Sequence, residues 1–173
     1  AVRTERRELL GDIHELAEAS TFEETSFLLH EGRLPARKEL LAYSAGLVKD
    51  RAVDDSVLTV ARQLPRRTHP MTVLRTLVSA LGAFDPEAED DSPAATERKS
   101  RRLIAQTATL VAALERIRGG LHPVAPDPGL SHAANFLYML KGERPSPEAA
   151  RSFDVALVLH ADHEFNASTF AAR

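Results

Sequence analysis

The densest group of chemically reactive side chains lies near the end of the chain, in the stretch HADHEFN. It contains His160, Asp162, His163, Glu164 and Asn166, directly after the apolar run VALVL. Histidine exchanges protons near neutral pH, binds metal ions and donates hydrogen bonds to anionic ligands, and carboxylates act as bases or as metal ligands. The residue types therefore fit a metal site, a ligand pocket, or a set of buried and hydrogen-bonded structural groups.

A metal site needs more ligands than this stretch offers at a suitable spacing. His160 and His163 lie three residues apart and share a helix face if the helix continues that far. With Asp162 or Glu164 they could ligate zinc or iron. The sequence has no H-E-x-x-H motif, no paired Glu-x-x-His motifs and no second cluster. The residues alone thus favour structural histidines over ligand binding, and both over a metal.

Other candidate residues have simpler interpretations. His69 and His132 each lie at or near an expected helix start, where capping and surface roles are common. A basic group on a long helix could bind the phosphates of CoA or a nucleic acid. Acidic residues alternate with it and no aromatic residues are interleaved, so a solvated helix face is favoured. This group consists of Arg98, Lys99, Arg101 and Arg102.

Composition narrows the functional class. The 173 residues fit one domain with its own core. With 22 Lys and Arg against 25 Asp and Glu, the net charge of -3 argues against nucleic acid or an acidic membrane surface as a partner. There is no cysteine, so disulfides and thiol chemistry are excluded, and a reducing, cytoplasmic location is expected. No apolar run is long enough to suggest a membrane span, and no secretory signal is recognisable.

The segments that must position these residues are predicted to be helices throughout, because apolar residues recur at helical spacing. Capping residues, prolines and glycines mark most of the boundaries. The run Val155 to Leu159 is expected to be buried on all sides, and the acidic stretch after Phe84 to form a solvated loop. The expected helices run from Ser20 or Thr21 to Leu29, through ARKELLAYSAGLV, from Asp54 or Asp55 to about Leu64, from Pro70 to Gly82, from about Ala94 to Ile117, through LSHAANFLYMLKG, and from Ser146-Pro147-Glu148 onward.

Several blocks resemble the citrate synthase family in its shorter prokaryotic form, which includes 2-methylcitrate synthases. They are DIHELAEASTFEETSFLLHEGRLPARKEL, HPMTVLRTLVSALGAFDPE and the final LSHAANFLYMLKGERPSPEAARSFDVALVLHADHEFNASTFAAR. The resemblance runs from about Asp12 to Arg173. It implies an all-α fold, a single helical domain over residues 1–173 that corresponds to the N-terminal part of the family's large domain, and a homodimer. The apolar segment HAANFLYML fits such an interface as well as an ordinary core.

The resemblance also implies a reaction and part of a site. The family condenses acetyl-CoA or propionyl-CoA with oxaloacetate, and both are substrates, so no further cofactor is expected. The second histidine of HADHEFN matches the residue that binds oxaloacetate, which assigns this role to His163. His160 and Asn166 match positions that line the same pocket.

The catalytic motifs of the family are missing. A Gly-Pro-x-His-Gly-Gly histidine, a Gly-Phe-Gly-His-Arg histidine and a later aspartate have no counterpart, and neither HGG nor GH occurs. The 173 residues are therefore expected to be inactive alone. Two interpretations remain open: an incomplete chain of a citrate or 2-methylcitrate synthase, or a non-catalytic helical module that serves dimerisation or regulation. The acyl-CoA preference cannot be read from the sequence.

Overall fold

The computed structural model describes residues 13–161, and within this range the chain is helical with no strand. The all-α prediction is therefore confirmed. The helices are α2 (Ile13–Ala19), α3 (Phe22–Glu31), α4 (Arg37–Lys49), α5 (Asp55–Gln63), α6 (Pro70–Leu81), the 3-10 turn η1 (Gly82–Phe84), α7 (Pro93–Arg118), α8 (His132–Lys141) and α9 (Pro147–Ala161).

Local sequence signals set most of the helix boundaries. Thr21 caps α3 in a reciprocal capping box with Glu24, and Asp54 caps α5 through its carboxylate. His69 caps α6, because its Nδ1 accepts a hydrogen bond from the N–H of Met71 at 3.3 Å. The capping role expected for His69 is thus confirmed. The long helix α7 begins within a residue of the predicted position and ends before Gly119.

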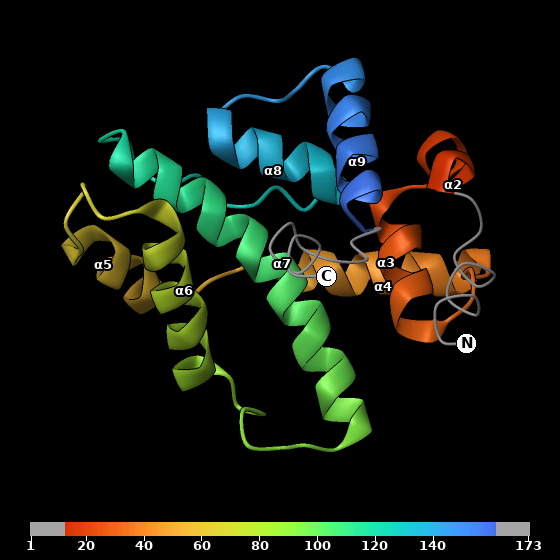
Figure 1. Cartoon of the computed structure of the whole chain (residues 1–173), viewed down its shortest axis with the longest axis horizontal. Coiled ribbons are helices and arrows are strands. Elements are labelled where there is room, and N and C mark those ends of the chain that lie inside the picture. The colour runs from red at the N-terminus through yellow and green to blue at the C-terminus, as the bar shows by residue number, and fades with distance from the viewer. Residues whose placement is uncertain (1–12, 162–173) are drawn as a thin grey trace, which may run out of the picture.

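The helix α7 is the central element of the fold (Figure 1). It contacts α4, α5, α6 and α8, so helices from both halves of the chain pack along it. The pair α5 and α6 lies on one side, and α8 leads to α9, which packs against α2 and α3. The chain therefore brings its first and last described helices together.

Two apolar clusters hold this arrangement. The larger one joins α5, α6 and α7 through Val57, Leu77 and Leu110, of which none is more than 1% exposed. The smaller one joins α2, α3 and α9 through Leu16, Leu28 and Val158. Each fully buried aliphatic side chain of this size contributes about 2 kcal/mol. No helix within residues 13–161 is long and apolar enough to cross a membrane.

The helix α8 is buried on several sides, as its composition predicts. Ala133 and Met139 are at most 1% exposed, and the helix packs against both α7 and α9. Packing inside the chain accounts for the apolar character of α8 on its own. A dimer interface along this helix stays a prediction.

Candidate functional site

The candidate site begins in the last turn of α9, where His160 is exposed. The Nδ1 atom of His160 lies 2.6 Å from the carbonyl oxygen of Ala156. A carbonyl can only accept, so Nδ1 donates this bond. In the neutral ring, Nε2 then carries the lone pair and can accept a proton or a hydrogen bond. His163 and Asn166, the other two predicted site residues, lie outside the described residues.

The expectation that Val155 to Leu159 are buried on all sides is wrong. Val158 is fully buried, whereas Leu159 is 45% exposed and residues 155–157 are half-buried. The reason is geometric: α9 packs on α2, α3 and α8, which together cover only part of its circumference. An apolar run thus reaches the surface at the end that carries His160.

Two charged residues of α9, Arg151 and Asp154, hold this helix against the end of α2 and the start of α3. Arg151 donates hydrogen bonds to the carbonyls of Ala17 and Ser20 at 2.7 and 2.8 Å, at the C-terminal end of α2. Asp154 accepts the N–H of Phe22 at 3.0 Å, at the first turn of α3. Arg151 and Asp154 also pair with each other at 2.9 Å. Cation and carboxylate each meet the helix end whose dipole favours them.

A second buried carboxylate serves α8 in the same way. The Oε1 atom of Glu23, a residue that is 9% exposed, accepts the N–H of His132 at 2.8 Å. His132 is the first residue of α8 and not its cap, since Ser131 accepts the N–H of Ala134. The helix start is thus stabilised by Ser131 locally and by Glu23 from α3.

His132 itself is structural and buried. It is 5% exposed and its ring stacks on Phe22 with 4.5 Å between the centroids. Burial, followed by the charge of Arg51, lowers the pKa of His132 to about 4, so the ring is neutral at pH 7. Its Nδ1 has no hydrogen-bond partner among the described residues. A surface role for His132 is therefore excluded.

Arg51 is the most deeply buried charged residue described here, at 2% exposed. Its guanidinium donates to the carbonyls of Asp127 and Leu130 at 2.9 Å each, and burial lowers its pKa. These bonds fix the loop that leads into α8. Sequence patterns did not reveal Arg51, Glu23, Arg151 or Asp154, because their partners lie far away along the chain.

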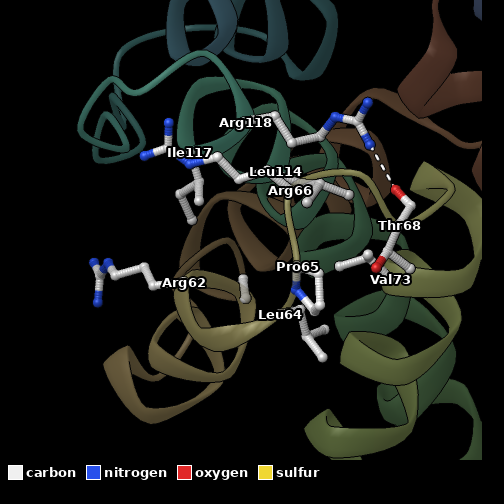
Figure 2. A pocket seen from close by; sticks show the side chains of 10 residues that line it. Arg62, Leu64, Pro65, Arg66, Thr68, Val73, Leu114, Ile117 and Arg118 are labelled. Atoms are coloured by element: carbon white, nitrogen blue, oxygen red, sulfur yellow. Dashed lines mark hydrogen bonds between the residues drawn. The ribbon is translucent and has the colours of Figure 1, made fainter.

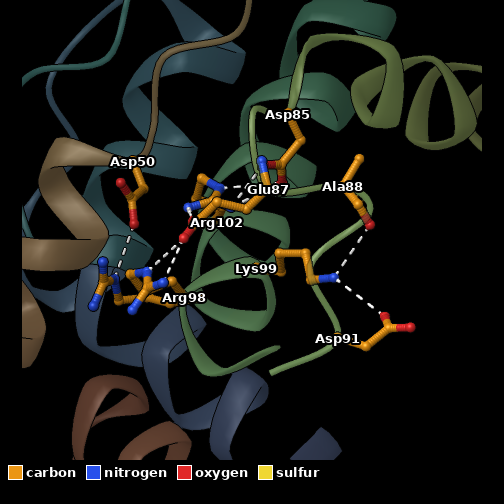
Figure 3. A network of polar contacts seen from close by, with 9 residues as sticks. Asp50, Asp85, Glu87, Ala88, Asp91, Arg98, Lys99 and Arg102 are labelled. Carbon is orange, nitrogen blue, oxygen red and sulfur yellow. Dashed lines mark hydrogen bonds and ion pairs between the residues drawn. The ribbon is translucent and has the colours of Figure 1, made fainter. Parts of the chain in front are cut away.

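The basic group on α7 is a network of ion pairs and not a solvated face (Figure 3). Arg102 contacts Asp85 and Glu87 at 2.7 Å each, and Arg101 contacts Asp50 at 2.9 Å. Hydrogen bonds from Arg98, and then from Arg102, lower the pKa of Glu87 to about 2. These cations are satisfied internally and bind the acidic loop to α7. A phosphate site at this group is not supported.

A second set of arginines surrounds a small pocket between α5, α6 and α7 (Figure 2). Its lining includes Arg62, Arg66 and Arg118, and Arg118 donates to the carbonyl of Thr68 at 3.0 Å. The cavity measures only about 10 Å³, room for one water molecule. It is too small for a substrate. Within residues 13–161, no group of three or more potential ligands is placed to hold a metal ion.

Comparison with known proteins places the chain in a family. The family model described as "Citrate synthase, C-terminal domain" matches residues 11–173. Citrate synthase from Deinococcus radiodurans is 52% identical over 92% of this chain, and 2-methylcitrate synthase from Mycobacterium tuberculosis is 45% identical over 93%. The crystal structure of citrate synthase from Pyrobaculum aerophilum superposes with a TM-score of 0.84 at 41% identity, over 92% of this chain.

The chain therefore belongs to the citrate synthase family. It spans 42% of the length of the Deinococcus radiodurans relative and 40% of the Mycobacterium tuberculosis relative. It likewise covers 42% of the Pyrobaculum aerophilum chain. The relatives include both citrate and 2-methylcitrate synthases, so membership defines the family and leaves the acyl group open.

Proposed function

We propose that this chain supplies part of the oxaloacetate-binding site of a citrate or 2-methylcitrate synthase. The complete enzyme condenses acetyl-CoA or propionyl-CoA with oxaloacetate and releases CoA, as a cytoplasmic homodimer. In this proposal His163 binds oxaloacetate, and His160 and Asn166 line the pocket. Residues 1–173 form a single helical domain of the enzyme.

One observation carries the proposal at the level of the residues. The last turn of α9 is exposed and presents His160 with Nδ1 donating to its own helix, so that Nε2 of the neutral ring can accept a hydrogen bond. The same helix is fixed upstream by Arg151 and Asp154, which supports a defined position for the turn. Positions 161 to 166 follow directly from this turn. A preorganised ligand group of this kind favours binding, because little ordering is left for the ligand to induce.

We expect these residues to bind oxaloacetate but not to catalyse its condensation with an acyl-CoA. Abstraction of a proton next to a thioester needs a base, a donor to the developing enolate and a clamp for the ketone. The family motifs that provide the first two are missing from the sequence. A hydrogen bond from histidine to a substrate carboxylate contributes about 1.5 to 3 kcal/mol. This corresponds to weak binding by the 173-residue chain.

Isothermal titration calorimetry with oxaloacetate tests the pocket. We expect binding by the wild-type chain, and a loss of at least tenfold in affinity for His163→Ala. The control is His122→Ala, which removes an exposed histidine from the loop before α8 and is expected to bind as the wild type does. Equal affinities for the wild type and His163→Ala, or no binding by a folded wild-type chain, would contradict the assignment of His163 to oxaloacetate binding.

A thiol-release assay tests the chemistry separately. Because the chain has no cysteine, a thiol reagent detects only the CoA that is released. We expect no release from acetyl-CoA or propionyl-CoA by the chain alone, with or without oxaloacetate. Release that depends on oxaloacetate would show that these residues include a base which the sequence did not reveal.

A further inference from the structure

The ring of His160 has one nitrogen whose role is fixed and one whose role depends on protonation. Nδ1 lies 2.6 Å from the carbonyl oxygen of Ala156 and donates a hydrogen bond to it. A carbonyl oxygen only accepts, so Nδ1 carries a proton in the neutral ring as well as in the imidazolium. The two forms of His160 therefore differ only at Nε2, which has a lone pair in the neutral ring and a proton in the imidazolium.

The keto form of oxaloacetate, a dianion at neutral pH, offers only hydrogen-bond acceptors, because its oxygens belong to two carboxylates and a ketone. The lone pair on Nε2 of neutral His160 would repel each of these oxygens. The imidazolium instead donates from Nε2, and its charge makes such a bond about twice as strong as a neutral one. A direct contact between His160 and this ligand thus requires the protonated ring.

The position of His160 at the end of a helix suits the charged form. It lies in the last turn of α9, and its side chain is exposed. Carbonyl groups at the C-terminus of a helix carry partial negative charge and stabilise a cation there. Because the side chain is exposed, the imidazolium also keeps part of its hydration.

The charged groups of the neighbouring helices leave His160 without a carboxylate partner in residues 13–161, where no ion pair to this ring is found. The carboxylate of Glu23 accepts the N–H of His132, and that of Asp154 pairs with Arg151. The helices that pack against α9 are α2, α3 and α8. Their described acidic and basic residues are Glu15 and Glu18 on α2, Glu23, Glu24, His30 and Glu31 on α3, and His132 and Lys141 on α8.

We propose that His160 binds a carboxylate of oxaloacetate only as the imidazolium, so that binding is coupled to the uptake of one proton at Nε2. The proton comes from the solvent and stays on the ring while the ligand is bound, and no covalent bond of the ligand changes. The inference rests on the oxaloacetate pocket proposed above and defines how His160 takes part in it. Linkage then requires the affinity for oxaloacetate to fall with rising pH, by up to about tenfold per pH unit.

Isothermal titration calorimetry with oxaloacetate in phosphate, HEPES and Tris at one pH counts the protons. The binding enthalpy varies linearly with the ionisation enthalpy of the buffer, and the slope is the number of protons taken up. For the wild-type chain at pH 7.5 we expect an uptake of about half a proton or more. We also expect affinity roughly threefold or more weaker at pH 8.5 than at pH 7.5.

Two matched variants assign the proton. His160→Gln keeps an N–H donor that does not titrate, so we expect it to bind without the proton uptake of the wild type. The control is His30→Gln. His30 is likewise exposed in the last turn of its helix, α3, and its Nδ1 lies 2.8 Å from the carbonyl oxygen of Ser26. His30→Gln should take up as many protons as the wild type, and circular dichroism establishes that both variants fold.

Nuclear magnetic resonance gives a direct readout that remains available if His160→Gln binds too weakly for calorimetry. The Cε1–H resonance of His160 is assigned by its loss in the spectrum of His160→Gln. When oxaloacetate is added to the wild type at pH 7.5, this resonance should move toward the imidazolium position. The corresponding resonance of His30 should stay in place.

The results separate this inference from the pocket on which it rests. Binding by the wild type without proton uptake, or with an unmoved His160 resonance, would contradict the inference and leave the pocket intact. Unchanged proton uptake in His160→Gln would assign the proton to another group and would also overturn the inference. The absence of binding by the folded wild-type chain would contradict the pocket itself, and the inference with it.

Discussion

Acidification should destabilise this protein through the buried histidine His132. Folded His132 has a pKa of about 4, against 6.5 for the unperturbed group. Between these pH values the unfolded chain binds a proton that the folded chain does not, so the free energy of unfolding falls as the pH falls. This contribution is intact above pH 6.5 and is lost progressively toward pH 4.

The magnitude follows from the difference between the two pKa values. At 1.36 kcal/mol per pH unit, a difference of about 2.5 units corresponds to a limiting loss of roughly 3 kcal/mol. About 2 kcal/mol of this is lost between pH 7 and pH 5. With a urea m-value of about 2 kcal/mol per molar, the midpoint of unfolding should move by roughly 1 M. Such a change is easily measured.

The assay compares the wild type with His132→Phe in urea at several pH values between 7 and 4.5, by circular dichroism. Phenylalanine keeps a ring against Phe22 and removes the titrating group. Carboxylates contribute equally to both proteins, so the difference between the two curves isolates His132. We expect His132→Phe to lose about 2 kcal/mol less than the wild type between pH 7 and pH 5.

A control variant removes a histidine that is exposed. His122→Phe should follow the wild type across the pH range, because its side chain is not buried in the fold. Parallel curves for the wild type and His132→Phe would refute the reasoning. They would show that the protonated ring is accommodated in the folded protein, by the carboxylate of Glu23 or by entry of water.

Three further substitutions test individual contacts. Arg51→Met should lower the free energy of unfolding by about 2 kcal/mol in urea, because two loop carbonyls lose their donors; an unchanged midpoint would mean that water replaces them. Asp154→Leu should cost roughly 2 kcal/mol in the same assay, since the N–H of Phe22 loses its acceptor and Arg151 loses its ion-pair partner, and a loss below 1 kcal/mol would contradict this. Gly46→Ala should raise the free energy of unfolding, by about 1 kcal/mol, only in an Arg101→Ala background, because the new Cβ would lie 2.8 Å from Nε of Arg101 in the wild type; equal effects in both backgrounds, measured in urea, would show that this contact is relieved without cost.

Most helix boundaries were predictable from the sequence, because they depend on interactions between residues that are close along the chain. The starts of α3, α5 and α6 depend on residues within three positions of the cap, which a reader of the sequence can see. The burial of α9 was not predictable in this way. An apolar run shows that a segment avoids water, but the number of neighbouring helices that cover it is a property of the whole arrangement.

The pairing of charged residues that lie far apart along the chain was also not predictable from the sequence. The basic group on α7 was read as solvated because nearby charges alternate, whereas Asp85 and Glu87 fold back over Arg102. Glu23 lies in the first turn of α3, yet its carboxylate accepts a hydrogen bond from the first residue of α8. The roles of His163 and Asn166 remain predictions from the family resemblance. Sequence motifs identified the candidate site, whereas the contacts that support it could be recognised only in the structure.

Glu23 and Asp154 each accept a hydrogen bond from the first residue of another helix, and these contacts affect the order of folding. Glu23 reaches its partner across 109 residues of chain, and Asp154 across 132. During synthesis, α3 therefore leaves the ribosome long before α9 can complete its first turn. The contact between Asp154 and Phe22 closes one of the longer loops in the described part of the chain, and such closures slow folding. The N-terminal helices should stay open to exchange with solvent until the end of α9 has been translated.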